Sequence, residues 1–157
     1  MESEVPGVTV REARVADLPA IVEMARELAA AVEDPPPPID APFLESMLVG
    51  ENRWSDCFIA IEADEPLGYV VANRYFEPHT GMRRLIIADL YVAKRGRKRG
   101  IGLQLFAAVV QRAGALRCHE ITWEIWNQNA TAFAFYEKLG GRPVLDVSLM
   151  RLRLQST

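Results

Sequence analysis

In residues 85–103, an apolar stretch, a basic loop and the start of an amphipathic helix follow directly after one another. The apolar stretch is strand-like and runs to Val92, and apolar residues recur at helical spacing from Ile101 onward. The loop between them contains Gly100, and Gly102 follows at once in the helical stretch. This order predicts a β-strand that enters a helix through a turn, so that the helix packs back onto a sheet.

The loop and the helix start have the chemistry of a diphosphate-binding site. Glycine carries no Cβ, so a ligand can approach its amide closely. The first amides of a helix have no intrahelical acceptor, and the helix dipole favours an anion beside them. The side chains of Arg97, Lys98 and Arg99 add positive charge at the same place.

A solvated basic loop, or a loop that contacts nucleic acid, would show a similar pattern, because short glycine patterns also arise by chance. The segment lacks the Gly-Lys-Ser/Thr ending of a P-loop and the full Gly-x-Gly-x-x-Gly of a dinucleotide-binding fold. The formal net charge is −3, and no aromatic residue interrupts the basic cluster at residues 94–99. Both features argue against a nucleic-acid partner.

The composition suits one cytoplasmic domain that spans residues 1–157. Half of the residues are hydrophobic, which is enough for a sizeable core. Cys57 and Cys118 each lie in an apolar stretch, which predicts buried, unreactive thiols in a reducing compartment. No apolar region of a signal peptide follows the acidic N-terminus, and no stretch approaches the ~18 apolar residues of a membrane span. We expect no membrane partner and no metal.

Hydrophobic periodicity divides the chain into strands and helices. Strands are predicted at residues 8–11, 57–61, 67–72, 85–92 and 121–126, with one or two closing strands within 144–154. Helices are predicted from Leu18 to the proline run at 35–38, from Asp40 to Leu48, over 101–116 and over 129–139. The predicted fold class is α/β (α+β): a mixed, largely antiparallel central sheet flanked by helices, with its parallel part around residues 85–126.

The last predicted helix carries a second set of chemically informative residues. Asn129 can cap its N-terminus, and Gly140 and Gly141 end it. The phenol of Tyr136, whose ordinary pKa is about 10, is protonated at neutral pH and can give a proton to a leaving thiolate. A hydrogen-bonded aromatic at the edge of the core is the alternative interpretation of this residue.

Both segments resemble signatures of the GNAT N-acetyltransferase superfamily. Residues 97–102, Arg-Lys-Arg-Gly-Ile-Gly, are similar to its Arg/Gln-x-x-Gly-x-Gly/Ala, and residues 89–92 are similar to the strand that precedes it. Residues 129–141 resemble its Asn-x-x-Ala-x-x-Phe-Tyr-x-x-x-Gly-Phe segment, with Gly141 in place of the final aromatic. The resemblance spans residues 8–154. It implies a GNAT-like fold and an enzyme that moves the acetyl group of acetyl-CoA to an amine.

The resemblance also implies where the donor binds and how it reacts. The acceptor amine should attack the thioester directly, and Tyr136 should protonate the sulfur of coenzyme A. The pantetheine arm should pair with the backbone of Leu90 and Val92, where strands 85–92 and 121–126 splay apart. The implied cofactor-binding residues are Leu90, Tyr91, Val92, Arg97, Lys98, Arg99, Gly100, Ile101, Gly102, Leu103, Asn129 and Tyr136.

Two carboxylates that interrupt apolar strands are candidates for the general base, because an ammonium must lose a proton before it attacks. These are Asp89 and Glu124. Strand alternation predicts that Glu124 shares a face with Thr122 and Trp126. A paired or surface-facing carboxylate is the alternative for both.

The acceptor is expected to be a small amine. Aromatic faces and an acid suit a cation, and the candidate residues are Trp54, Tyr75, Glu77 and Trp126. Tyr75 and Glu77 fall in a predicted loop at residues 75–83. Among subfamilies the chain is similar to the diamine acetyltransferase-like branch, and many family members are homodimers. The alternatives are a non-catalytic acyl-CoA sensor on the same fold and an enzyme that acetylates protein N-termini or lysines.

Overall fold

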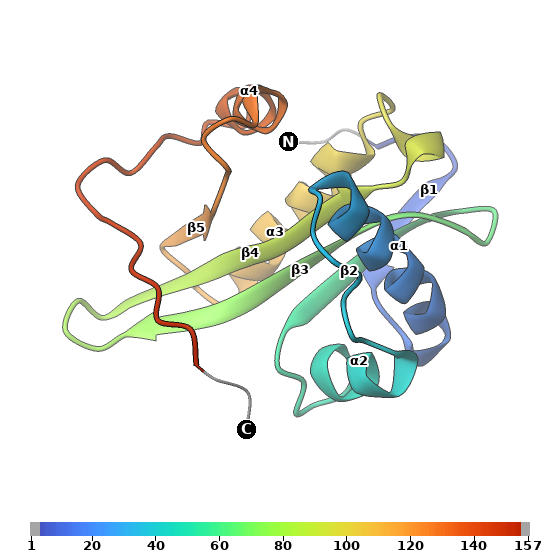
Figure 1. Ribbon diagram of the computed structural model, residues 1–157, viewed down its shortest axis with the longest axis horizontal. Helices are drawn as coiled ribbons and strands as arrows, with labels where there is room; N and C mark the ends of the chain where they lie inside the picture. The colour runs from blue at the N-terminus through green and yellow to red at the C-terminus, as the bar shows by residue number, and fades with distance from the viewer. Residues whose placement is uncertain (1–3, 155–157) are drawn as a thin grey trace. The chain divides into compact units, whose positions relative to one another are not determined.

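The computed structural model describes residues 4–154, and the chain divides into two compact units, residues 1–124 and 125–157. In the first unit the described residues form a five-stranded sheet in the order β1-β2-β3-β4-β5 (Figure 1). Its strands are β1 Val8–Glu12, β2 Asp56–Glu62, β3 Glu65–Glu77, β4 Met82–Val92 and β5 Glu120–Trp123. All neighbouring strands are antiparallel except β4 and β5, which are parallel. The predicted fold class is confirmed.

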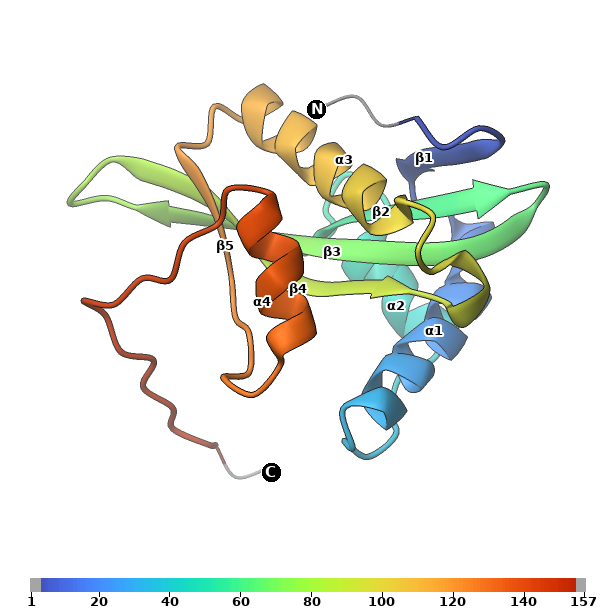
Figure 2. The ribbon, with the colours of Figure 1, turned by 90° about the horizontal axis from the view of Figure 1, so that it is seen from above.

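Helices cover both faces of this sheet (Figure 2). Helices α1 (Leu18–Ala31) and α2 (Ala41–Leu48) lie on one face, and α3 (Ile101–Ala115) lies on the other. On the first face, Leu18 of α1 belongs to one apolar cluster with Ile59 and Tyr69 of the sheet. On the second face, Phe106 of α3 meets the ring of Trp123 edge-on, with centroids 5.7 Å apart. Two short 3-10 turns, η1 (Val15–Asp17) and η2 (Lys94–Gly96), precede α1 and α3.

The proline run at residues 35–38 separates α1 from α2, as predicted. Proline has no amide hydrogen and cannot continue a helix, so α1 ends at Ala31 and the chain becomes extended. The next helix begins after Asp40, whose Oδ1 accepts a hydrogen bond of 2.9 Å from the amide of Phe43. No helix within residues 4–154 has the length and apolarity needed to cross a lipid bilayer.

The predicted loop at residues 75–83 is wrong, because β3 and β4 continue through most of it. Tyr75 pairs with Arg84 and Glu77 with Met82, which leaves only residues 78–81 for the turn. Tyr and Phe favour strands, and each strand supplies the ladder partner that the other requires. The result is a hairpin that carries Tyr75 and Glu77 on a strand.

The predicted strand over 121–126 is too long. β5 ends at Trp123, opposite Ile87, and Glu124 and Trp126 lie outside any strand. A strand persists only while a neighbour completes its ladder, and β4 changes register directly after Ile87. The expected common face of Glu124, Thr122 and Trp126 therefore does not exist.

The second unit contains α4, Ala130–Lys138. The side chain of Asn129 caps it by accepting a 3.0 Å hydrogen bond from the amide of Ala132, as predicted. The closing strands predicted within 144–154 are absent from the described residues, which have no regular structure there. Side chains such as Leu145, 91% exposed, have no neighbouring strand to cover them. Alternating apolar residues favour a strand, but a strand forms only where a neighbouring strand pairs with it.

Candidate active site

A bulge interrupts β4 at Ala88. Val71 of β3 lies opposite Asp89, but the next pair joins Ala72 to Ile87, so Ala88 has no partner and is exposed. The ladder between β4 and β5 also ends at Ile87. Among residues 4–154, the segment from Asp89 to Val92 therefore pairs with β3 only, and Ala88 pairs with neither neighbouring strand. This leaves one edge of its backbone available to an extended ligand.

The loop after β4 presents backbone amides at the start of α3. Lys98 and Gly100 have φ angles of 60° and 81°, in the left-handed region, and Gly100 is the N-cap of α3. This turn directs the chain so that, within residues 4–154, the amides of residues 98–103 donate to no other group of the protein. Such a row of amides at a helix N-terminus is a site for an anion.

Most of the nearby basic side chains already have partners. Arg97 donates from Nε to the carbonyl of Val92 at 3.0 Å, and its guanidinium lies 5.8 Å from the centroid of the Tyr91 ring. Arg99 forms an ion pair with Glu62 of β2, which lowers the pKa of that carboxyl. Arg95 pairs with Glu65 at 3.6 Å. In the described chain, Lys94 and Lys98 are the members of this cluster without such a contact.

Asp89 is a carboxylate with a neutral partner. It is half-buried on the sheet face that α1 and α2 cover, and its Oδ2 accepts a hydrogen bond of 3.0 Å from the hydroxyl of Tyr69. Every other Asp or Glu in the five strands forms an ion pair with arginine. These are Glu12, Asp56, Glu62, Glu65, Glu77 and Glu120. Among residues 4–154, Asp89 is therefore the strand carboxylate that has no arginine partner.

Glu124, the second candidate base, is exposed beyond the end of β5. Asn129, Tyr136 and Trp126 belong to the second unit, where Asn129 uses its side-chain oxygen to cap α4. Tyr136 is half-buried, and its ring meets Phe135 at a centroid distance of 5.0 Å. Burial raises the pKa of Tyr136 to about 12, so the phenol is protonated at neutral pH. Trp126 is 65% exposed.

The residues predicted to hold the acceptor are not equally available. Arg84 lies over the ring of Tyr75, 4.6 Å from its centroid, and donates to Glu77 Oε1 at 3.1 Å. The other oxygen of Glu77 accepts from the hydroxyl of Thr80 at 2.8 Å. Tyr75 and Glu77 thus both already contact the guanidinium of Arg84. Trp54, in the loop before β2, is 77% exposed.

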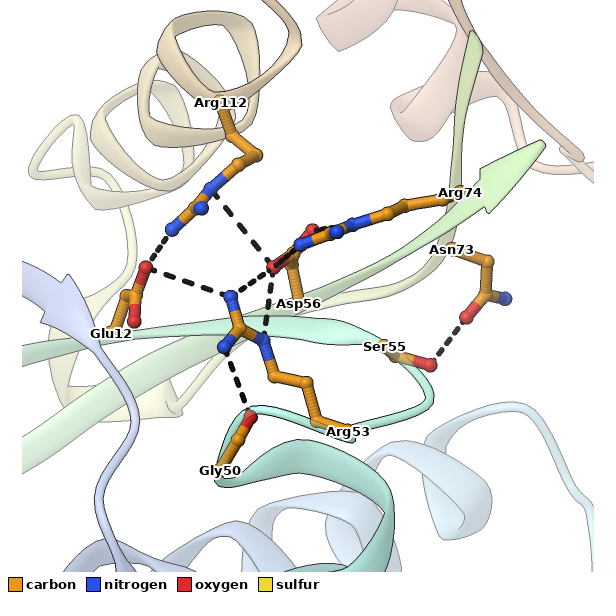
Figure 3. A network of polar contacts seen from close by, with 8 residues as sticks. All are labelled: Glu12, Gly50, Arg53, Ser55, Asp56, Asn73, Arg74 and Arg112. Carbon is orange, nitrogen blue, oxygen red and sulfur yellow. Dashed lines mark hydrogen bonds and ion pairs between the residues drawn. The ribbon is translucent and has the colours of Figure 1, made fainter. Parts of the chain in front are cut away.

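A network of charges around the buried Asp56, on the α3 face, had no signal in the sequence (Figure 3). Asp56 is 1% exposed and accepts hydrogen bonds from Arg53 and Arg74, the shortest at 2.7 and 3.0 Å. Burial alone would raise the pKa of Asp56, but these two arginines lower it below its ordinary value. Glu12 pairs with Arg112 of α3. Because the members come from distant parts of the chain, no local spacing predicts their convergence.

A thiol nucleophile and a metal centre receive no support from the described residues. Cys57 is buried and unpaired, and burial raises its pKa to about 12, so it is an unreactive thiol, as predicted. Cys118 is also free, and it is half-buried. Within residues 4–154, no three His, Cys, Asp or Glu side chains converge as they would around a metal ion. The groups that the described residues supply for chemistry are carboxylates, phenols, backbone amides and cationic side chains.

Comparison with known proteins agrees with this arrangement. The model of the Acetyltransferase (GNAT) family matches residues 18–141. An L-methionine sulfoximine/L-methionine sulfone acetyltransferase of Pseudomonas aeruginosa is 27% identical, over 95% of this chain and 96% of the relative. A thialysine N-epsilon-acetyltransferase of Sus scrofa is 27% identical, over 88% of this chain and 86% of the relative. The crystal structure of a possible acetyltransferase from Clostridium difficile 630 has the same fold, with a TM-score of 0.80 and 21% identity over 95% and 99% of the two chains.

Proposed function

The chain belongs to the Acetyltransferase (GNAT) family and is an acetyl-CoA-dependent N-acetyltransferase, and we propose that it acetylates the primary amine of a small molecule by direct transfer. Residues 1–157 then act as one cytoplasmic domain. The observation that carries the proposal is the carboxylate of Asp89 on β4, which has no arginine partner among residues 4–154. It lies next to the backbone edge of Leu90 and Val92 that no strand pairs with, where Arg97 contacts the carbonyl of Val92.

The donor is held by backbone and by charge. The pantetheine arm extends β4 by pairing with Leu90 and Val92, as a strand added to an edge. The diphosphate rests on the amides of residues 98–103. Lys98 can contact it directly, because within residues 4–154 its side chain forms no ion pair or hydrogen bond that would first have to break. Arg97 and Arg99 join only if they leave the carbonyl of Val92 and the carboxylate of Glu62.

The reaction forms a carbon–nitrogen bond and breaks the carbon–sulfur bond of the thioester. The acceptor arrives as an ammonium, which is attracted to the carboxylate of Asp89 and gives it one proton. The neutral nitrogen attacks the thioester carbonyl, and backbone amides stabilise the oxyanion. The departing sulfur takes the proton of Tyr136, whose raised pKa keeps the phenol protonated at neutral pH. The nitrogen of the new amide loses its second proton, which restores the phenol of Tyr136.

Asp89 is a better candidate for the base than Glu124. Asp89 lies beside the bulge of β4, half-buried and fixed by one hydrogen bond, whereas Glu124 is exposed after the end of β5. A base must be within hydrogen-bond reach of the proton that it removes, which favours a group on the strand that pairs with the donor.

Relatives support a small acceptor. The two acetyltransferases described above are named for methionine sulfoximine or sulfone and for thialysine, small molecules with a primary amine. Of the residues predicted to contact the acceptor, Trp54 and Trp126 have exposed ring surface for a cation, while Tyr75 and Glu77 are engaged by Arg84. We assign the first pair to acceptor contacts and the second pair to the hairpin.

Homodimerisation is supported by the exposed segment at residues 144–154. Its apolar side chains are 60–91% exposed, and such segments usually have a partner. An antiparallel pairing with the same segment of a second copy would place Asp146 opposite Arg151 and Leu145 opposite Leu152. Sedimentation should detect a dimer in the intact protein and a monomer in the double variant Leu145→Lys, Leu152→Lys. A monomeric intact protein would contradict this assignment.

The first experiment is thermal stabilisation by acetyl-CoA, with ATP for comparison. A ligand at about 100 times its Kd adds about 2.7 kcal/mol to the free energy of unfolding. A shift with acetyl-CoA and none with ATP is expected, followed by release of coenzyme A in a screen of small amines. The variants Asp89→Asn and Glu124→Gln then locate the base. Loss of turnover in the second variant alone would move that role to Glu124, and no shift at millimolar acetyl-CoA would contradict the proposed donor site.

A further inference from the structure

We infer that Tyr69 is a positioning residue for the general base: its hydroxyl fixes one carboxylate oxygen of Asp89 and leaves the other for the acceptor ammonium. This inference rests on the proposed role of Asp89. It adds a residue that neither the sequence motifs nor the family signature indicates.

The register of the sheet brings the two side chains together. Tyr69 lies two residues before Val71, the partner of Asp89 across the strands, so all three side chains point to the same face. The phenol reaches diagonally and donates to Oδ2 at 3.0 Å. Tyr69 is 1% exposed, and its ring lies 6.3 Å from that of Tyr91, so packing holds the hydroxyl in place.

The chemical character of the donor distinguishes this pair from the ion pairs of the other strands. Burial and the neighbouring charge of Asp89 both raise the pKa of Tyr69, so the phenol stays protonated and neutral. A neutral donor orients a carboxylate without cancelling its charge, whereas a guanidinium does both. Within residues 4–154 the second oxygen, Oδ1, receives no hydrogen bond from the protein. An ammonium therefore meets an oriented carboxylate that keeps its full charge.

The neighbouring tyrosine offers a matched comparison. Tyr91 lies directly opposite Tyr69 on the same face, but its hydroxyl donates to Glu27 of α1 at 2.7 Å. Two adjacent phenols thus hold two carboxylates, one on the strand of the proposed donor site and one on an exposed helix surface. Glu27→Gln makes the same carboxylate-to-amide change as Asp89→Asn, at the carboxylate that has no part in the proposed chemistry.

Tyr69 gives up no proton in this scheme. The ammonium loses its proton to Oδ1 of Asp89, and the phenol remains a hydrogen-bond donor to Oδ2 before and after the transfer. Its effect should therefore appear only through Asp89. This requirement separates positioning from a general contribution to packing.

The test is Tyr69→Phe, which removes one oxygen and keeps the ring. We expect kcat/KM to fall by about 10-fold or more, since a hydrogen bond to a charged group is being lost. The acid limb of the pH profile of kcat/KM should move to higher pH, because that bond favours the charged carboxylate. The Kd of acetyl-CoA should stay close to that of the intact protein, and the melting temperature should fall by only several degrees. Glu27→Gln should leave the pH profile unchanged.

A double-mutant cycle decides between the possible outcomes. In the Asp89→Asn background, Tyr69→Phe should cause no further loss. An equal loss in both backgrounds, or an unmoved pH profile in a folded Tyr69→Phe, would overturn the inference. Full activity of Asp89→Asn would instead overturn the proposed base. If Tyr69→Phe does not fold, 3-fluorotyrosine placed at Tyr69 alone makes the same test, because a more acidic phenol is a stronger hydrogen-bond donor: the acid limb should move to lower pH, and an unmoved limb would contradict the inference.

Discussion

Arg99 and Glu62 are joined through two guanidinium nitrogens, with N···O distances of 3.0 and 2.5 Å. Arg99 begins the turn into α3, and Glu62 is the last residue of β2. The sequence predicts Arg99 as a phosphate ligand, but in the folded chain its charge is already compensated. A diphosphate on the amides of residues 98–103 must therefore compete with Glu62 for this guanidinium.

Glu62→Gln should strengthen the binding of acetyl-CoA by about two- to fivefold at low salt, the range expected when an exposed ion pair no longer competes. Isothermal titration at two salt concentrations measures the change, which should shrink as salt screens the charges. Glu65→Gln is the matched control, because it releases Arg95, a residue outside the proposed phosphate site. Equal affinity in all three proteins would show that Arg99 takes no part in donor binding.

Gly100→Ala should destabilise the protein and weaken acetyl-CoA binding. Gly100 has a φ of 81°, and an L-residue in that conformation costs about 1–2 kcal/mol. Gly114 lies inside α3, and a Cβ added there meets nothing within 4 Å. Gly114→Ala should therefore stabilise the protein by about 0.5–1 kcal/mol and leave binding unchanged. Urea unfolding and acetyl-CoA titration of both variants measure these effects. A Gly100→Ala protein as stable as the parent would contradict the role of the left-handed turn.

Local sequence predicts the elements that depend on local chemistry. The proline run, the start of a helix at Asp40, the cap Asn129 and the turn into α3 are all found where the sequence places them. The errors concern strand ends. β3 and β4 are extended by each other, β5 stops where the bulge removes its partner, and residues 144–154 form no strand. Strand length depends on neighbours that are distant in sequence.

In the candidate site too, features within one segment could be predicted, whereas contacts between distant segments could not. Glycine spacing and the basic cluster predict an anion site, because they act through backbone and charge within one segment. Which cations are free could not be predicted, since Glu62 lies 37 residues from Arg99. The hydrogen-bond partner of Asp89 could not be predicted either. Tyr69 lies near Asp89 only because of the register of β3 on β4, which the sequence does not show.

Tyr136→Phe should lower kcat by about 100-fold or more and leave the Kd of acetyl-CoA unchanged, if Tyr136 protonates the leaving sulfur. Because burial raises the pKa of this phenol to about 12, its ionisation should produce no alkaline limb in the rate profile between pH 6 and 10. Stopped-flow measurement of coenzyme A release and equilibrium titration separate the two quantities. A variant with undiminished kcat would remove Tyr136 from the mechanism.

Asp56→Asn should cost about 1.5–3 kcal/mol of folding free energy at neutral pH, because the buried carboxylate accepts charged hydrogen bonds from Arg53 and Arg74. The arginines lower the pKa of Asp56 despite its burial, so its stabilisation is complete above the unfolded pKa of about 3.9 and is lost as the pH falls through the lower folded pKa. The stability difference between the two proteins should therefore be constant from pH 8 to 5 and shrink below about pH 4. Urea unfolding at each pH measures it, with exposed Asp34→Asn as the control. A difference that persists at pH 2 would show that packing, not charge, sets the contribution of Asp56.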